Sequence, residues 1–190
     1  MNQHIIACPV LALELQAVLN ELLAPPQVHL MDYSIHINPD IMEDELHKNI
    51  ARLDNATDSI ALLVGKGCHA RQPITTIAHQ CSAHLPNKSN CIELILGTEK
   101  TKALQQNRTA IMTPGWITMI HQSIKDGNWR VEDARMNLGW YDQILLLDTG
   151  VTPLDEETIM AFFELIQVPL DILPVNLAHF KKEVQLLLQP

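Results

Sequence analysis

Hydrophobic residues along this chain form short apolar runs separated by segments with helical spacing. The runs IIAC (5–8), VHLMDY (28–33) and IALLV (60–64) have the length and the branched apolar content of buried strands. Between the first two runs, the leucines of segment 11–24 recur every three or four positions, which is typical of an amphipathic helix. This part of the chain therefore predicts strands that alternate with helices.

The same alternation continues to the carboxyl end. Further strands are expected at 109–113, 143–150 and 168–173, and helices at 39–53, 73–81, 116–125, 131–141 and 154–166. Segment 81–86 (CSAHLP) is short enough to be a strand or a connection, and the pattern is helical from Cys91 onward. Asp40 and Glu43 stand at capping-box spacing at the start of the helix expected at 39–53. Apolar strands that alternate with amphipathic helices predict a three-layer α/β sandwich with a mostly parallel sheet, of the Rossmann-like, doubly wound type.

Length and charge narrow the class of protein. At 190 residues, of which 47% are hydrophobic, the chain can bury one substantial core, and we expect a single domain over residues 1–190. The net charge of −9 argues against a nucleic-acid-binding surface, which needs clustered lysine and arginine. No basic segment precedes the apolar start, and Glu14 and Glu21 interrupt it. We therefore expect no export signal, no membrane span and a cytoplasmic protein.

In that compartment the four cysteines are expected to be reduced thiols or metal ligands rather than disulfides. In parallel α/β folds the strand-to-helix loops gather at the carboxyl edge of the sheet. Cys8 ends the first expected strand, and Cys68 follows the IALLV strand by four residues. Cys91 would begin a helix in which Asn90 is the N-cap and Glu93 occupies the third position. Three thiols are thus expected to converge at one edge.

A cluster of three thiols is suited to a metal. Soft sulfur ligands select zinc or iron–sulfur clusters, and three protein ligands leave a fourth position open. The start of its helix would stabilise the Cys91 thiolate, whereas Cys81 would lie at the opposite edge and take no part. The alternative is that the cysteines are small apolar core residues, since cysteine is among the most buried residue types. Neither CxxC nor HxxxH spacing is present to decide between these interpretations.

Further candidates for the pocket wall or the surroundings of the thiols are Glu14, His36, Gly67, His69, Gly115, Trp116 and Asp148. His69, next to Cys68, is either a fourth ligand or base, or an exposed loop residue. His36 either faces the same edge or is only a turn residue, and Trp116 either forms a pocket wall or packs in the core. Neither GxGxxG nor GxxxxGK[ST] occurs, so nucleotide phosphates have no recognisable binding loop.

Six short segments carry a resemblance to a known family. They are ACPVLALEL (7–15), IHINP (35–39), GKGC (65–68), NCIELILG (90–97), TPGW (113–116) and LDTG (147–150). In this order, over about residues 5 to 150, they resemble the uncharacterised family named domain of unknown function 1638. Its members occur largely in anaerobes and methanogens, often beside genes for corrinoid-dependent methyltransferases, so the resemblance implies a role in methyl or corrinoid metabolism. Family members tend to have Cys-Gly and Asp-Cys where this chain has Cys68-His69 and Asn90-Cys91.

Two classes of function follow from the three-cysteine site, and a third follows without it. The first is a methyl-transfer or thiol-activating enzyme, because a bound metal lowers the pKa of an exchangeable thiol or water. The second is a non-enzymatic accessory protein that handles a metal or a corrinoid for a corrinoid methyltransferase. The third is a small-molecule-binding module with structural cysteines. The sequence leaves open whether the protein is an enzyme.

Overall fold

The strands form two separate three-stranded sheets, both entirely parallel. The computed structural model describes residues 2–36, 38–53, 59–151 and 154–189, so residue 37 of the IHINP motif lies outside these ranges. The amino-terminal sheet has the order β2-β1-β3, with β1 at Gln3–Ala7, β2 at Gln27–Leu30 and β3 at Ser59–Leu63. The carboxy-terminal sheet has the order β4-β5-β6, with β4 at Thr109–Met112, β5 at Gln143–Asp148 and β6 at Leu170–Pro174. The predicted parallel α/β fold is confirmed, with its strands divided between two sheets.

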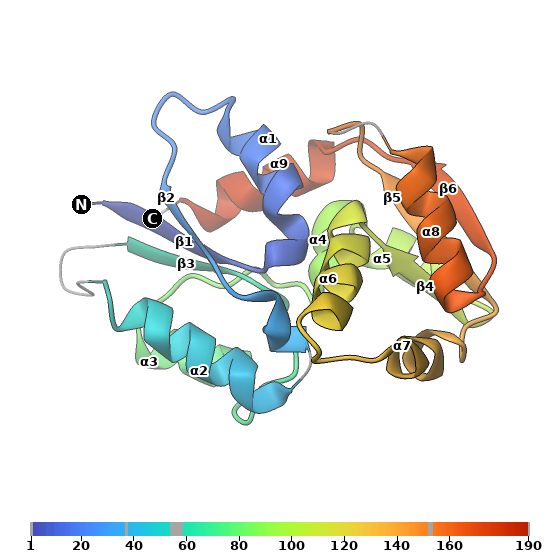
Figure 1. Ribbon diagram of the computed structural model, residues 1–190. Helices are drawn as coiled ribbons and strands as arrows, with labels where there is room; N and C mark the ends of the chain where they lie inside the picture. Colours follow the sequence, from blue (N-terminus) through green and yellow to red (C-terminus); the bar gives the residue numbers. More distant parts are fainter. Residues whose placement is uncertain (1, 37, 54–58, 152–153, 190) are drawn as a thin grey trace.

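The helices cover the amino-terminal sheet on both sides. Over the whole of the described residues, the helices are α1 (Ala12–Leu19), α2 (Pro39–Ile50), α3 (Ile74–Gln80), α4 (Cys91–Leu96), α5 (Thr98–Leu104), α6 (Pro114–Lys125), α7 (Val131–Leu138), α8 (Glu156–Ile166) and α9 (Ala178–Leu187), with short 3-10 turns η1 (Pro9–Leu11) and η2 (Tyr33–His36). Figure 1 shows α1 and α9 on one side of this sheet and α2 and α3 on the other. Coverage on both sides explains why β1 and β3 read as unbroken apolar runs.

Local signals fix several helix starts, with one correction. The predicted capping box of Asp40 and Glu43 is wrong, because Asn38 is the N-cap of α2 and its side chain accepts a hydrogen bond from the amide of Asp40. The Glu43 carboxylate instead accepts hydrogen bonds from the main-chain and side-chain amides of Gln72, at 2.9 and 3.0 Å. This carboxylate therefore ties α2 to the loop before α3. The CSAHLP segment contributes one bridge, between His84 and Ala61 of β3.

The two sheets share one core. Their buried hydrophobic residues belong to a single cluster. The Thr113 hydroxyl, at the end of β4, donates a buried hydrogen bond of 2.9 Å to the Val10 carbonyl in η1. A Cβ atom at Gly115 would lie 2.3 Å from the same carbonyl oxygen, so only glycine allows α6 this approach. Among the described residues, no helix combines the length and apolarity needed to cross a membrane.

Candidate functional site

A cavity of about 320 Å³ lies beyond the carboxyl ends of β1 and β3. Apolar side chains from η2, from α2 and from Val64, the residue after β3, form part of its wall. Its sulfur, imidazole and indole groups come from Cys8, His36, Cys68, His69, Cys91 and Trp116. The three cysteines predicted to converge therefore line one cavity, together with three of the other candidates.

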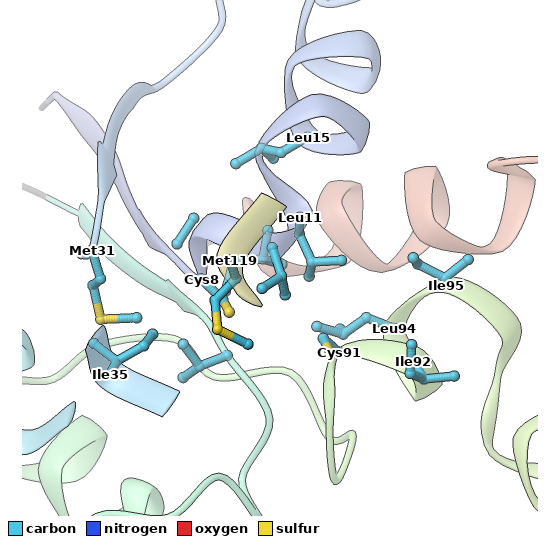
Figure 2. Close-up of a cluster of buried hydrophobic side chains, with 14 of the residues drawn as sticks. Cys8, Leu11, Leu15, Met31, Ile35, Cys91, Ile92, Leu94, Ile95 and Met119 are labelled. Atoms are coloured by element: carbon cyan, nitrogen blue, oxygen red, sulfur yellow. The ribbon is translucent and has the colours of Figure 1, made fainter. Parts of the chain in front are cut away.

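Each thiol lies at or just beyond a strand or helix end, and main-chain hydrogen bonds position Cys8 and Cys68. The Cys8 amide donates to the Leu63 carbonyl at 3.3 Å, which continues the pairing of β1 with β3 by one residue. The Cys68 amide donates to the Gly65 carbonyl at 3.1 Å and so closes a tight turn after β3. Cys91 is the first residue of α4. Figure 2 shows Cys8 and Cys91 within one cluster of buried hydrophobic side chains.

Two glycines bring the Cys68 turn against the segment before Cys91. The Gly67 amide donates to the Ser89 carbonyl at 3.0 Å. A Cβ atom at Gly65 would lie 2.3 Å from the same oxygen, closer than real Cβ contacts come. Gly67 is thus part of the support of the cavity rather than of its lining.

The predicted cap of α4 is confirmed. The Asn90 side chain accepts a hydrogen bond of 2.9 Å from the Glu93 amide. The Glu93 carboxylate in turn accepts one of 2.7 Å from the Ser89 amide. Together these bonds hold the turn that begins at Cys91.

Burial, rather than the position of Cys91 at the start of a helix, has the largest effect on the pKa values of the thiols. Burial raises the pKa of Cys91 to about 12, and the Cys68 charge adds to the effect. Burial and the charge of Cys91 raise the pKa of Cys8 well above its ordinary value, and burial also raises that of Cys68. The expectation of a stabilised Cys91 thiolate is therefore wrong for the protein without a metal. At neutral pH all three side chains are thiols.

His36 and Trp116 pack together beside Cys8 and Cys91. The His36 Nε2 atom lies 3.3 Å from the Cys8 sulfur, and burial lowers the pKa of His36 to about 4. The His36 and Trp116 rings have centroids 4.6 Å apart. The Trp116 indole nitrogen has no partner of normal hydrogen-bond geometry among the described residues, but it lowers the pKa of Cys91 and so lies near that thiol. Both side chains therefore turn polar atoms towards sulfur.

The thiols are not arranged as a finished coordination site. Within residues 2–36, 38–53, 59–151 and 154–189, no three His, Cys, Asp or Glu side chains surround a common point where an ion could be held. Cys8, Cys68 and Cys91 share a cavity, and the chemistry of three sulfurs fits zinc or iron. Coordination would require each thiol to lose its proton and the three sulfurs to approach a common point.

Other predicted residues lie away from this cavity. Glu14 is buried in α1, where its carboxylate accepts a hydrogen bond of 3.1 Å from the Thr149 hydroxyl. Asp148 ends β5 in the other sheet and accepts from the Gly150 amide at 3.0 Å. Neither belongs to the cavity lining drawn from the described residues. The Cys81 sulfur lies 3.2 Å from the Ile77 carbonyl at the end of α3, outside that lining as predicted.

The sequence analysis did not identify all of the cavity lining. Met42 of α2 and Ile35 of η2 are two apolar lining residues that it did not name as candidates. Met42 and Leu46 are four residues apart and both buried, so helical spacing marks the inward face of α2. That spacing could have identified Met42 as buried, but no local pattern indicates which cavity a buried side chain will meet.

The chain matches a family model described as "Protein of unknown function (DUF1638)" over residues 30–184. No curated protein and no solved structure is detectably similar to the chain.

Proposed function

The chain belongs to the DUF1638 family, and we propose that it is a metal–thiolate protein in which Cys8, Cys68 and Cys91 together bind one zinc ion or one iron–sulfur cluster. The observation that carries this proposal is that thiols from three separate segments line one cavity. Cysteines that served only as packing would have no reason to share one opening. The Cys81 sulfur, hydrogen-bonded within its own helix end and outside the lining, is the contrasting case.

The electrostatics of the cavity are consistent with a site that forms as the metal binds. Metal ligands must be thiolates, so binding releases protons and its affinity rises with pH. Burial and mutual repulsion keep Cys8 and Cys91 protonated without a metal, and a cation removes that repulsion. The neutral imidazole of His36 lies with its Nε2 atom 3.3 Å from the Cys8 sulfur, close enough to accept a hydrogen bond from the thiol. Its lowered pKa makes it a poor base, so the protons released by metal binding pass to solvent.

When bound by three thiolates, such a metal would keep an open position and activate a thiol or water there. His36, Met42 and Trp116 would exclude bulk water from that position. A methyl-transfer or thiol-activating enzyme would use the position for reaction. A metal- or corrinoid-handling accessory protein of a methyltransferase would use it for transfer of its cargo.

A second candidate is a small-molecule-binding module whose cysteines remain neutral thiols. The raised pKa of each of the three thiols favours this candidate. In that case the cavity would take an uncharged, largely apolar ligand, and exposure to metal would leave the protein unchanged.

Metal content separates the two candidates. Protein purified without oxygen should carry about one zinc ion or one iron–sulfur cluster per chain by elemental analysis, with a visible absorption band if iron is present. Single Cys→Ser changes at positions 8, 68 and 91 should each remove most of the metal. Cys81→Ser is the matched control and should leave the content unchanged.

Reconstitution gives the decisive second measurement. Apoprotein titrated with Zn²⁺ should bind one equivalent and release protons, more tightly at pH 8 than at pH 6. Binding that survives the triple Cys→Ser change, or an apoprotein that takes up neither zinc nor iron, would exclude the metal–thiolate site and leave the binding module.

A further inference from the structure

A second cavity, of about 490 Å³, adjoins the thiol cavity. It runs along β4 and is bounded by α7 and the connection between α6 and α7. His36 and Trp116 line both cavities, so this pair of packed rings forms their common wall. We call the second space the aromatic cavity. A volume of this size accommodates a small organic ligand.

Aromatic side chains are concentrated around this cavity. The chain has three tryptophans and two tyrosines. Trp116, Trp129 and Tyr141 line the cavity, and Trp140 packs against the Arg108 side chain at its wall. If these aromatic rings served only to fill the core, we would expect them to be spread among the buried residues of both sheets. Aromatic faces around an open cavity are instead suited to stacking on a planar ligand.

The main chain of β4 also contributes to the cavity. All four of its residues, 109 to 112, belong to the lining. Since alternate side chains of a strand point to opposite faces, four consecutive lining residues mean that the strand presents its edge. Among the described strands β4 pairs only with β5, so its other edge has free amides and carbonyls. These groups can bond the rim of a flat heterocycle.

The charge of the cavity favours an anion. Arg108 is the one fully charged side chain among the described lining residues, and no carboxylate belongs to that lining. The Asp142 carboxylate lies outside the lining, 3.6 Å from the Arg108 Nη2 atom, and offsets part of its charge. Its guanidinium lies 4.7 Å from the Trp140 ring centroid and donates to the Trp140 carbonyl, which fixes its position. The neighbouring amide side chains of Gln105 and Asn137 add donors and acceptors. The cavity therefore combines aromatic faces for stacking, a strand edge for hydrogen bonds and one cation.

We propose that the aromatic cavity binds a planar heteroaromatic anion, whose ring stacks on Trp129 and Tyr141, whose ring nitrogens bond the β4 edge, and whose acidic group meets Arg108. The site stands independently of a metal. Through His36 and Trp116 a ligand held here would be adjacent to the thiol cavity.

Calorimetry on metal-free protein tests this site with quinoxaline-2-carboxylate, a flat two-ring acid with ring nitrogens. Saturable one-to-one binding is expected, with quenching of tryptophan fluorescence. Naphthalene-2-carboxylate, which lacks the ring nitrogens, and quinoxaline-2-carboxamide, which lacks the charge, should each bind more weakly. Arg108→Gln should weaken the acid about tenfold, as loss of a charged hydrogen bond does. The carboxamide should bind this variant and the wild type equally.

Matched variants keep the result interpretable. Arg130→Gln changes an exposed arginine outside the lining and should leave affinity unchanged. Trp129→Leu should weaken all three probes several-fold through loss of stacking. Cys91→Ser should lose metal and still bind the acid, which separates this site from the thiol proposal. Absence of saturable binding by every probe, or binding that neither Arg108→Gln nor Trp129→Leu changes, would overturn the assignment.

Discussion

The two sheets are alike in size and direction but differ in the order of their strands. In the amino-terminal sheet β1 lies between β2 and β3, so the chain leaves β1 on one side and returns on the other. In the carboxy-terminal sheet β4, β5 and β6 follow one another. A crevice opens beyond the carboxyl ends where the order reverses, which is where parallel α/β folds bind ligands. Cys8 and Cys68 follow the two strands at that reversal, whereas Asp148 ends a strand with none.

Burial separates individual strands rather than the two sheets. The strands β1, β3 and β4 are buried apart from their first residues, while β2 and β6 are largely exposed along their length. The buried strands β1 and β3 can therefore hold side chains in fixed positions around the thiol cavity. The four predictions that follow compare the two sheets, or the contacts between them, in descending order of expected effect.

The largest difference is expected between the stability losses caused by Ile→Ala changes on the two sheets. Ile6 of β1 is fully buried, whereas Ile172 of β6 is 47% exposed. Ile6→Ala should lower the free energy of unfolding by about 2–5 kcal/mol, the range for deleting a buried aliphatic side chain. Ile172→Ala should lower it by less than about 1 kcal/mol, because the side chain is already partly exposed and its removal leaves no buried cavity. Urea denaturation measures both, and equal losses would contradict the comparison.

The cost of changing a glycine to alanine should also differ between the loops that follow the two sheets. Gly65→Ala places a Cβ atom 2.3 Å from the Ser89 carbonyl oxygen and should cost about 1–3 kcal/mol by overpacking. Gly150 has a φ of +68° and open space around it, so Gly150→Ala should cost about 1 kcal/mol of backbone strain. Gly65→Ala should also reduce metal content, because it separates the Cys68 turn from Cys91. An unchanged free energy of unfolding in Gly65→Ala would mean that residues 89–90 can move away from the new Cβ atom without cost.

The hydrogen bond that joins the two sheets can be removed without a change of shape. Thr113→Val leaves the buried Val10 carbonyl without its donor and should cost about 1–3 kcal/mol. Thr118, on the exposed side of α6, provides the control, and Thr118→Val should be nearly neutral. Thermal unfolding followed at more than one wavelength should still show one transition. Two transitions in Thr113→Val would mean that this bond alone couples the sheets.

The smallest effect concerns pH. Burial raises the pKa of Glu14 above 4.5, although the Thr149 hydrogen bond opposes the shift. The folded protein therefore holds this proton more tightly than the unfolded chain does. Its contribution to stability is present below pH 4.5 and is lost as the pH rises through the raised pKa. Glu14→Gln should remove that decline from the pH profile of unfolding. The exposed Glu99→Gln should not, and identical profiles for all three proteins would contradict the prediction.

Sequence reasoning succeeded where the structure depends on neighbouring residues. The Asn90 cap, and with it the place of Cys91 at the start of α4, follows from a four-residue pattern. The helix α9 was not predicted, although Phe180, Val184 and Leu187 carry its buried face at helical spacing. This spacing is a local signal that is sufficient to predict the helix.

Other features depend on contacts between distant segments. Nothing in the sequence of β5 indicates that it joins a second sheet, so the sequence could not show that Asp148 ends a strand of the other sheet, outside the cavity lining. The high pKa of Cys91 arises because surrounding segments exclude water, an effect larger than that of a helix start. The pairing of His36 with Trp116 across 80 positions of chain likewise has no local pattern.

The division into two sheets also sets an order of assembly during synthesis. The strands of the amino-terminal sheet all lie before residue 64, so this sheet can pair while the rest of the chain is still being made. The thiol cavity has to wait for Cys91 and then for Trp116. Trp116 is made roughly 50 residues after the end of β3, which takes several seconds at ordinary rates of translation. During that interval Cys8 and Cys68 lack the wall that later shields them. We expect a ribosome-bound chain stopped before α6 to react with a thiol-specific alkylating reagent at both positions, and the completed protein to resist it.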